Sequence, residues 1–315
     1  MRALVARNGR LVVQERPTPE VVADRVLVEV AGAGLNRADL LQLGGGYPAP
    51  PGWPPDILGL EFAGTVASVG DDVRDLRTGD RVFGIVGGGA QATVVLTREE
   101  LCVPVPDPLD LVAAGGVPEV FLTAHDALVT QAALRPGERV LIHGVGSGVG
   151  TAAIQIAGAI GAVSVGTSRT EEKLQRCKQL GLDEGVLAEP DMARRIGEVD
   201  VVLDLIGGAY LATDVEVCRP RGRIVLVGLV GGSSATLDLG AILRKRITLM
   251  GTVLRSRPEY EKAAATAAFR REVVPLLANG GLRPVIDRVF PLDEAEDAYN
   301  ALGSNTTFGK VVLAP

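Results

Sequence analysis

The segment best suited to chemistry runs from Arg139 to Ala157 and reads RVLIHGVGSGVGTAAIQIA. It predicts a short apolar strand, a glycine-rich turn and a helix, which together point backbone N–H groups and a positive helix end at a diphosphate. The strict G-x-G-x-x-G register would fall on Val145, Ser147 and Gly150, so only its last position is glycine. A turn that merely lets strand and helix pack closely is therefore the alternative interpretation. The candidate dinucleotide contacts are Gly144, Gly146, Ser147, Gly148, Val149 and Gly150.

The end of the next strand indicates which dinucleotide would bind. A carboxylate about 20 residues after the glycine loop holds the ribose 2′-hydroxyl in NAD sites. Here that place is taken by Thr167-Ser-Arg-Thr170, where Ser168 and Arg169 offer donors, and Lys173 lies one helical turn further on. These groups suit a 2′-phosphate, so we expect NADPH rather than NADH. The alternative is that Arg169 and Lys173 are solvated charges paired with nearby glutamates.

Composition and charge limit the other possibilities. The 315 residues are 47% hydrophobic and include 40 glycines, enough for two domains. The net charge of -6 and a pI near 5.2 argue against nucleic acid as the main partner. No cationic and apolar leader opens the chain, and no apolar run reaches the ~20 residues of a membrane-spanning helix. We therefore expect a soluble, cytoplasmic protein.

The cysteines and histidines are too few and too scattered for a metal site. Cys102, Cys177 and Cys218 are widely spaced, and the only histidines are His125 and His143. A catalytic zinc generally takes three protein ligands. The sequence therefore predicts reduced, buried thiols and no bound metal.

The elements around the glycine loop suggest an insertion. Residues 1–117 read as short strands separated by turns, and from Pro118 strands alternate with helices, as in parallel β-α-β units. Ile247–Met250 is expected to be an edge strand, and a long helix is predicted from Glu259 to Asn279. Because the C-terminal segment returns to strand character, we expect both ends of the chain to complete one β-rich domain.

Several motifs in order resemble the medium-chain dehydrogenase/reductase superfamily, and within it the zinc-free, zeta-crystallin-like quinone oxidoreductases. The stress-induced quinone oxidoreductases are the most similar branch. The resemblance covers nearly the whole chain and is carried by Gly34-Leu-Asn-Arg-Ala-Asp39, Gly46-Tyr-Pro48, Leu58-Gly-Leu-Glu61, Gly79-Asp-Arg-Val82, Leu122-Thr-Ala124, Arg135-Pro-Gly-Glu138, Asp204-Leu-Ile-Gly-Gly208, Val253-Leu-Arg-Ser-Arg257 and Gly309-Lys-Val-Val-Leu313.

The resemblance implies an α/β plus β fold, in which a GroES-like, β-barrel-type catalytic domain carries an inserted Rossmann doubly wound parallel sheet. We place the catalytic domain at residues 1–118 and 260–315 and the NADP(H)-binding domain at residues 119–259. Zinc alcohol dehydrogenases carry a cysteine and a histidine where this chain has Asn36 and Leu60. Without a Lewis acid, reduction of an electrophilic acceptor is favoured over alcohol oxidation.

The same resemblance implies roles for individual residues. Asn36 and Thr123 are candidates to position the nicotinamide ribose or the acceptor, or are ordinary turn residues. Tyr47 follows a run of glycines and would stack on a quinone or donate its hydroxyl to it, or simply closes the barrel. The glutamate Glu61 and Asp39 are interpreted as structural, and His143 as a packing or capping residue. Further coenzyme contacts are expected from Ile206, Leu229, Val253 and Asn305.

The predicted function is therefore reduction of a quinone by NADPH through hydride transfer. Reduction of an activated C=C bond, as in enoyl or enone reductases, remains open. So does a cofactor-binding protein of the crystallin or RNA-associating type. The expected partners are a small quinone or enone and, by pairing of the exposed edge strand, a second copy in a homodimer.

Overall fold

The computed structural model describes residues 1–315, which divide into two compact units. Unit 1 comprises residues 1–122 and 254–315, and unit 2 comprises residues 123–253. The boundaries fall inside the helix Pro118–His125 and just after Val253. None of the helices combines the length and apolar character that a membrane crossing requires.

Unit 1 is built on a seven-stranded sheet with the order β14-β15-β3-β4-β5-β7, in which β6 also pairs with β3. All pairs are antiparallel except β14 with β15. Alternating valines of β3 and β4 point into one apolar core with Phe62 and Val82. The strands are β1 (Arg2–Arg7), β2 (Arg10–Glu15), β3 (Arg25–Gly34), β4 (Glu61–Val69), β5 (Arg81–Ile85), β6 (Val94–Arg98), β7 (Cys102–Pro104), β14 (Ile286–Pro291) and β15 (Lys310–Ala314).

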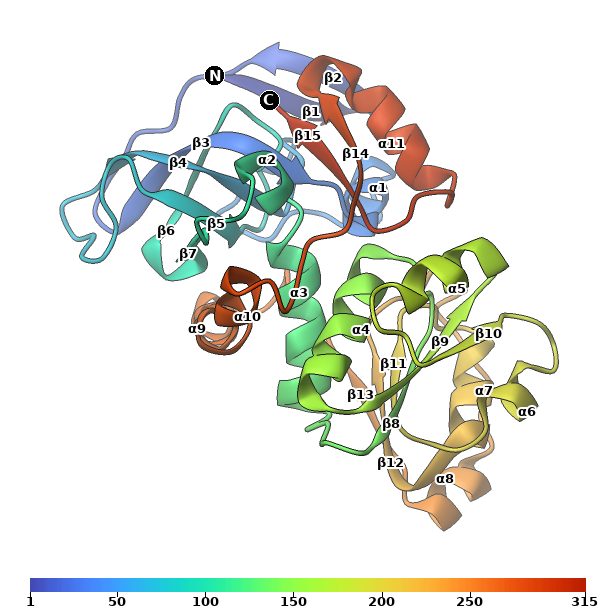
Figure 1. The fold of residues 1–315 in the computed structure, drawn as a ribbon. Coiled ribbons are helices and arrows are strands. Elements are labelled where there is room, and N and C mark those ends of the chain that lie inside the picture. Colours follow the sequence, from blue (N-terminus) through green and yellow to red (C-terminus); the bar gives the residue numbers. More distant parts are fainter. The chain divides into compact units, whose positions relative to one another are not determined.

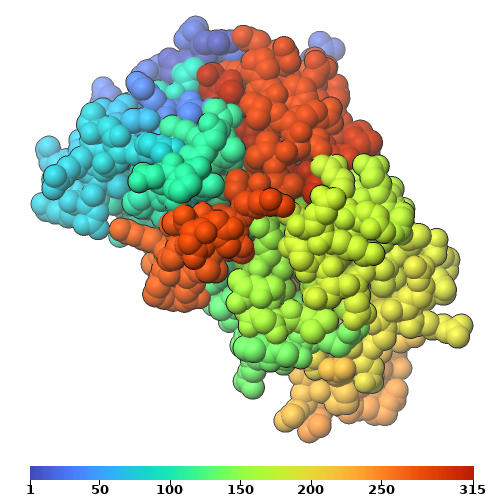
Figure 2. Space-filling model, viewed as in Figure 1, coloured from blue at the N-terminus to red at the C-terminus, as the bar shows by residue number.

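Both ends of the chain belong to unit 1. In Figure 1 the C-terminal strand β15 lies beside β3, and in Figure 2 red C-terminal atoms lie directly against blue N-terminal ones. The helices of this unit are α1 (Arg37–Leu43), η1 (Glu99–Leu101), α2 (Leu111–Ala114), α3 (Pro118–His125), α9 (Glu259–Glu272), α10 (Val274–Ala278), η3 (Leu292–Glu294) and α11 (Ala295–Gly303).

Unit 2 holds a six-stranded sheet with the order β10-β9-β8-β11-β12-β13 and only parallel pairs. Numbered from β8, this is the order 3-2-1-4-5-6 of a doubly wound dinucleotide-binding sheet. The GroES-like and Rossmann folds that the resemblance implies are thus confirmed. The elements are η2 (Asp126–Gln131), β8 (Arg139–Ile142), α4 (Gly148–Ile160), β9 (Val163–Ser168), α5 (Glu171–Lys178), β10 (Glu184–Leu187), α6 (Met192–Ile196), β11 (Val199–Asp204), α7 (Tyr210–Val217), β12 (Cys218–Leu226), α8 (Leu239–Lys245) and β13 (Thr248–Gly251).

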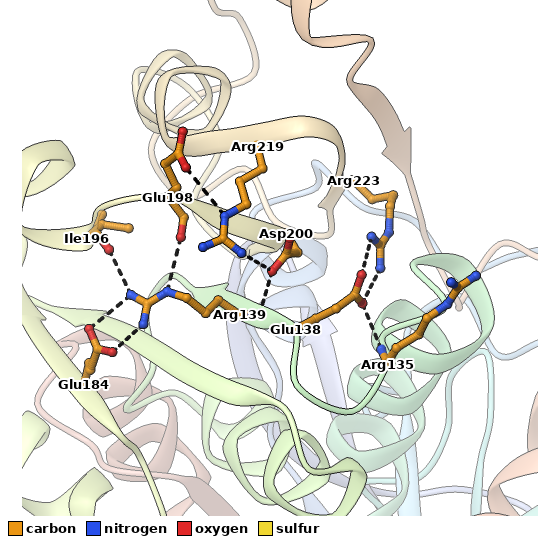
Figure 3. Close-up of polar contacts among 9 residues, drawn as sticks. All are labelled: Arg135, Glu138, Arg139, Glu184, Ile196, Glu198, Asp200, Arg219 and Arg223. Atoms are coloured by element: carbon orange, nitrogen blue, oxygen red, sulfur yellow. Dashed lines mark hydrogen bonds and ion pairs between the residues drawn. The ribbon is translucent and has the colours of Figure 1, made fainter.

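A network of ion pairs fixes the starts of these parallel strands (Figure 3). Arg139, the first residue of β8, pairs with Glu184 of β10 and donates its backbone N–H to Asp200 at 2.9 Å. Asp200 also accepts from Arg219 at 2.8 Å. The network lies at the amino ends of the strands, so it stabilises the edge of the sheet opposite to the glycine loop.

Two sequence expectations need correction. The long helix predicted from Glu259 to Asn279 is divided at Val273 into α9 and α10, because Pro275 cannot donate the backbone hydrogen bond that a continuous helix needs. The helix predicted over Phe121–Gln131 is an α-helix followed by a π-helix, with Ala132 N–H bonded to Ala127 O.

Candidate functional site

The glycine loop joins β8 to α4 at the point where the strand order of unit 2 reverses. In open α/β sheets, ligands bind outside the carboxyl ends of the strands at this switch point. Gly144 has φ +64°, in the left-handed region that favours glycine. A Cβ on Gly150 would lie 2.5 Å from Val145 O, so α4 can approach the loop this closely only with glycine there. Gly150 thus does what the last glycine of the dinucleotide motif does.

Helix α4 begins in a way that leaves it ready for an anion. Ser147 is its N-cap, and the exposed serine Oγ accepts the N–H of Gly150 at 3.1 Å. The helix runs for 13 residues with no acidic residue in its first turn. Free N–H groups at this end, together with the helix dipole, favour a bound phosphate.

The end of β9 lies directly beside this loop. Val145 N–H donates to Thr167 O at 3.0 Å, which connects the loop to the end of strand β9. Ser168 is buried, Arg169 is exposed and Lys173 is half-buried. The three candidate 2′-phosphate residues thus lie between the last residue of β9 and the first turn of α5, and no carboxylate stands between Thr167 and Thr170.

Apolar candidates follow the next strands of the same sheet. Ile206 comes after β11, and its Cδ1 lies 3.3 Å from the position of a Cβ on Gly144. Leu229 comes after β12 and is 53% exposed, and Val253 comes after β13 and is 46% exposed. These residues lie on the same edge of the sheet as the glycine loop, because all six strands are parallel.

His143 is not the isolated packing residue that the sequence suggests. Its Nδ1 is 2.7 Å from Thr167 Oγ1 and its Nε2 is 2.7 Å from Asp214 Oδ1, with all three side chains buried. Burial raises the pKa of Asp214 to about 6, while the hydrogen bond from His143 lowers it. Asp214 is far away in the sequence on α7, so a single sequence gives no sign of this contact.

Unit 1 contains a second group of candidates, centred on Asn36. Its Nδ2 donates to Glu61 Oε1 at 2.9 Å, and its Oδ1 accepts from Lys310 Nζ at 2.8 Å. Lys310 also lies 2.6 Å from Glu61 Oε1, and Glu61 is fully buried. Asp39 Oδ2 accepts from Asn36 N–H at 2.7 Å. Both polar atoms of the Asn36 side chain therefore have protein partners.

Tyr47 is held near this group by Arg255. The Arg255 guanidinium lies 5.0 Å from the centre of the Tyr47 ring and donates to Tyr47 O at 2.9 Å. It donates as well to Gly87 O at 2.8 Å and Gln42 Oε1 at 2.6 Å. Burial and the charge of Glu119 raise the pKa of Tyr47, while Arg255 lowers it. The hydroxyl is therefore protonated at neutral pH and can donate.

Glu119 is a further titratable residue beside Glu61 in unit 1. Its backbone N–H donates to Glu61 Oε2 at 2.9 Å. Burial and the nearby carboxylate of Glu61 raise the pKa of Glu119 to about 8, and burial raises that of Asp39 to about 6. Sequence reasoning missed the roles of Glu119, Arg255 and Lys310, since their partners are distant in the chain. The only signal was that each lies in or beside a motif of the resembled family.

The remaining two candidates are placed separately. Thr123 is half-buried in α3, at the first residue of unit 2. Asn305 is half-buried after α11, with φ +61°, and its Nδ2 donates to Gly303 O at 3.3 Å. These observations fix their local conformation and assign neither of them a ligand.

The residues around Glu61 do not fit a zinc ion. Lys310 already supplies a cation 2.6 Å from the Glu61 carboxylate. No group of three or more His, Cys, Asp or Glu side chains is arranged to hold a metal ion. A zinc site would need such a set of ligands.

Comparisons with known proteins agree with this architecture. The model of the alcohol dehydrogenase GroES-like domain matches residues 22–107, and that of the zinc-binding dehydrogenase family matches residues 148–268.

Among curated relatives, the chain is 33% identical over 302 residues to a quinone oxidoreductase of Pseudomonas aeruginosa, covering 92% of this chain and 91% of that one. It is 34% identical over 307 residues to the spectinabilin polyketide synthase system protein NorB of Streptomyces orinoci. That match covers 94% of this chain but only 14% of the synthase protein, so the chain spans a small part of such relatives.

Solved structures of similar fold include a quinone oxidoreductase and an enoyl reductase. A quinone oxidoreductase of Pseudomonas syringae pv. Tomato DC3000 superposes with a TM-score of 0.90 at 29% identity, covering 100% of both chains. The CurK enoyl reductase superposes with a TM-score of 0.86 at 27% identity, covering 99% of both chains.

Proposed function

Since the chain belongs to the medium-chain dehydrogenase/reductase superfamily, as a quinone oxidoreductase-like oxidoreductase that uses a nicotinamide coenzyme, we propose that it reduces quinones with NADPH. The bound coenzyme would supply a hydride. The observation that carries the proposal is the glycine loop at the switch point of unit 2, followed at the end of β9 by basic and hydroxyl side chains in place of a carboxylate.

The preference for NADPH follows from charge at the end of β9. A 2′-phosphate brings strong acceptor oxygens, which Ser168, Arg169 and Lys173 can meet with donors. Ser168 Oγ and Thr170 already shape the turn, because Thr170 N–H donates to Ser168 Oγ at 3.3 Å. In NADH the same place would present only a 2′-hydroxyl, for which a carboxylate is the usual acceptor.

The coenzyme proposal is tested by changing Lys173. We expect Lys173→Ala to raise the KM for NADPH about tenfold, as expected for losing one charge-assisted hydrogen bond of ~1.5 kcal/mol, and to leave the KM for NADH unchanged. The matched control is Lys178→Ala, an exposed lysine near the end of the same helix. An unchanged ratio of the two KM values in Lys173→Ala would refute the proposed phosphate contact.

Within unit 1, we propose that Tyr47 donates its hydroxyl to an oxygen of the acceptor. Its raised pKa keeps the proton on the phenol, and Arg255 fixes both its ring and its backbone carbonyl. A quinone needs only weak assistance, because water can protonate the aromatic product. We expect Tyr47→Phe to keep most of the kcat with naphthoquinones and to raise the KM. A complete loss of turnover in a folded Tyr47→Phe protein would instead make the tyrosine an essential acid.

The second candidate function is reduction of an activated C=C bond, favoured by the likeness to the CurK enoyl reductase. The two functions differ in the acid that they need, because a carbanion formed at carbon requires a proton donor. Steady-state assays with naphthoquinones and with alkenals under the same conditions separate them. Turnover of alkenals alone would favour the second candidate.

We also propose a homodimer formed through β13. This strand is at the edge of the sheet and pairs only with β12. Leu239 and Leu243 on α8 are 68% and 77% exposed, and Leu249 on β13 is 41% exposed. Open strand edges and exposed leucines are typical of a surface that another copy covers. Leu243→Asp should yield monomers in sedimentation velocity, whereas Val22→Asp, at an exposed valine of unit 1, should not.

A further inference from the structure

Four buried polar side chains lie directly beneath the glycine loop of unit 2. His143, Asp204 and Asp214 are 0% exposed and Thr167 is 1% exposed. They come from four different elements: His143 follows β8, Thr167 is in β9, Asp204 ends β11 and Asp214 is on α7. Together they connect the carboxyl ends of β8, β9 and β11, at the candidate coenzyme site, to helix α7.

Most hydrogen bonds of these four side chains have an identifiable donor and acceptor. If His143 is neutral, the Thr167 hydroxyl donates to Nδ1 at 2.7 Å and Nε2–H donates to Asp214 Oδ1 at 2.7 Å. Asp204 Oδ1 accepts the N–H groups of Ile206 at 2.7 Å and Gly207 at 2.9 Å. This bond pattern shapes the turn after β11, next to the loop.

Two atoms are left over. Asp204 Oδ2 and Asp214 Oδ2 are buried and have no hydrogen-bond partner. His143 brings the two carboxyl groups near each other, because its backbone N–H donates to the carbonyl of Leu203, the residue before Asp204, at 3.1 Å, and its Nε2 is bonded to Asp214. Asp204 is also among the groups that raise the pKa of Asp214. Buried acceptors without donors are rare and costly. A single proton between the two oxygens would satisfy both.

We propose that Asp204 and Asp214 share one proton between their Oδ2 atoms, and that this proton, with His143, positions the glycine loop and the Asp204 turn for the coenzyme. The second part rests on the proposed function, because it assumes that a dinucleotide binds at this edge of the sheet. Asp204, Asp214 and His143 are positioning residues here, since none of them reaches the exposed edge.

The surrounding charges favour the shared proton. Tyr210 contacts His143 edge-on, with ring centres 4.8 Å apart, and its pKa is raised by burial and by Asp204 and lowered by Arg169. Cys218, whose pKa is influenced by Asp214, is a buried thiol, and burial raises its pKa to about 11. The hydrogen-bond donors to the two carboxyl groups are His143 and the backbone N–H groups of Ile206 and Gly207, and no Lys or Arg side chain is among them. Two such carboxylates cannot readily both be ionised.

The consequence is that coenzyme binding weakens as the pH rises. When the shared proton leaves, Asp204 and Asp214 repel each other, and the turn after β11 moves away from helix α7. The pKa of Asp214, raised by burial to about 6, puts the loss above about pH 6. We therefore expect the wild-type Kd for NADPH to rise about tenfold more than that of a proton-independent variant between about pH 5 and about pH 8.

Asp214→Asn is that variant. Its amide oxygen can still accept from His143 Nε2–H, and its amide nitrogen can donate permanently to Asp204 Oδ2. Asp214→Leu is the contrasting variant, because it removes both contacts. We expect Asp214→Asn to bind NADPH tightly at both pH values and Asp214→Leu to bind weakly at both. An Asp214→Asn protein with the same pH dependence as the wild type would overturn the proposal.

A measurement without coenzyme separates this proposal from the proposed function. The pKa of Asp214 is raised on folding, so the stabilisation is present below the unfolded value of 3.8 and is lost as the pH rises through about 6. The Tm of unliganded Asp214→Asn should therefore gain on the wild type as the pH rises. If this gain appears but NADPH does not bind, the shared proton stands and the function is wrong.

Discussion

Replacing Lys310 by methionine should strongly destabilise unit 1. The lysine Nζ lies 2.6 Å from Glu61 Oε1 and 2.8 Å from Asn36 Oδ1, and also donates to Leu35 O. The Lys310 side chain is 4% exposed and that of Glu61 is 0% exposed. Lys310→Met keeps much of the volume and removes the only cation bonded to this buried carboxylate. Removing one partner of a buried pair costs about 3–5 kcal/mol.

The cost should be visible in thermal unfolding. Unit 1 comprises residues 1–122 and 254–315. For a domain of that size, 1 kcal/mol shifts the Tm by about 2–4 °C, so the loss of Lys310 should lower the Tm by about 6–20 °C. Differential scanning calorimetry of the wild type and of Lys310→Met measures this shift. Lys178→Met, at an exposed lysine, is the matched control and should change the Tm by less than about 2 °C.

A double variant distinguishes the buried charge from lost packing. Glu61→Gln with Lys310→Met replaces the pair by neutral groups and should recover most of the stability, since the penalty comes mainly from the unpaired charge. The reasoning would be refuted if Lys310→Met alone cost less than about 1 kcal/mol, or if the double variant were less stable than the single one.

Three other perturbations have defined outcomes. The pKa of Glu119 is raised to about 8, so its contribution to the stability of the fold is present below the unfolded value of 4.5 and is lost as the pH rises through 8. In urea unfolding, Glu119→Gln should therefore gain stability over the wild type with rising pH. The same pH dependence of stability in both proteins would contradict this. Gly150→Ala should lower the free energy of unfolding by about 1–3 kcal/mol and weaken NADPH binding, because its Cβ would lie 2.5 Å from Val145 O. Gly158→Ala in the same helix meets nothing within 4 Å and should raise the free energy of unfolding by about 0.5–1 kcal/mol. Equal effects of the two variants in unfolding and in fluorescence titration of NADPH would count against the close approach at Gly150. In Arg255→Lys, a single ammonium group cannot donate to Gly87 O, Tyr47 O and Gln42 Oε1 together. The variant should therefore raise the KM for the quinone several-fold and leave the Kd for NADPH unchanged. An unchanged KM for the quinone with a raised Kd for NADPH would show that Arg255 does not act on the acceptor site.

Local patterns allowed the sequence to predict the fold well. The strand, glycine turn and helix after Arg139 are contiguous, and the strand edge predicted at Ile247–Met250 is the edge strand β13. The motif register was less informative, since Gly150 alone retains the close approach of the dinucleotide motif. The break at Val273 depended on one proline inside an otherwise helical pattern.

The candidate site was less predictable, because its charges meet through tertiary structure. Lys310 reaches Glu61 from the last strand of the chain, and Arg255 reaches Gln42 and Gly87 from the segment after β13. His143 appeared isolated in the sequence, yet α7 brings Asp214 to it. Such pairs combine residues that are far apart in the chain, and neither spacing nor periodicity in a single sequence indicates them.

The central claim is that the switch-point loop of unit 2 holds NADPH and that this coenzyme reduces a quinone. Rapid mixing of the protein with NADPH and a naphthoquinone under anaerobic conditions, followed by the absorbance of the reduced nicotinamide, tests it most directly. The account predicts that NADPH is consumed in equal amount to the quinone reduced, and faster than NADH at the same concentration. No consumption of either coenzyme, or consumption only with an alkenal as acceptor, would contradict it.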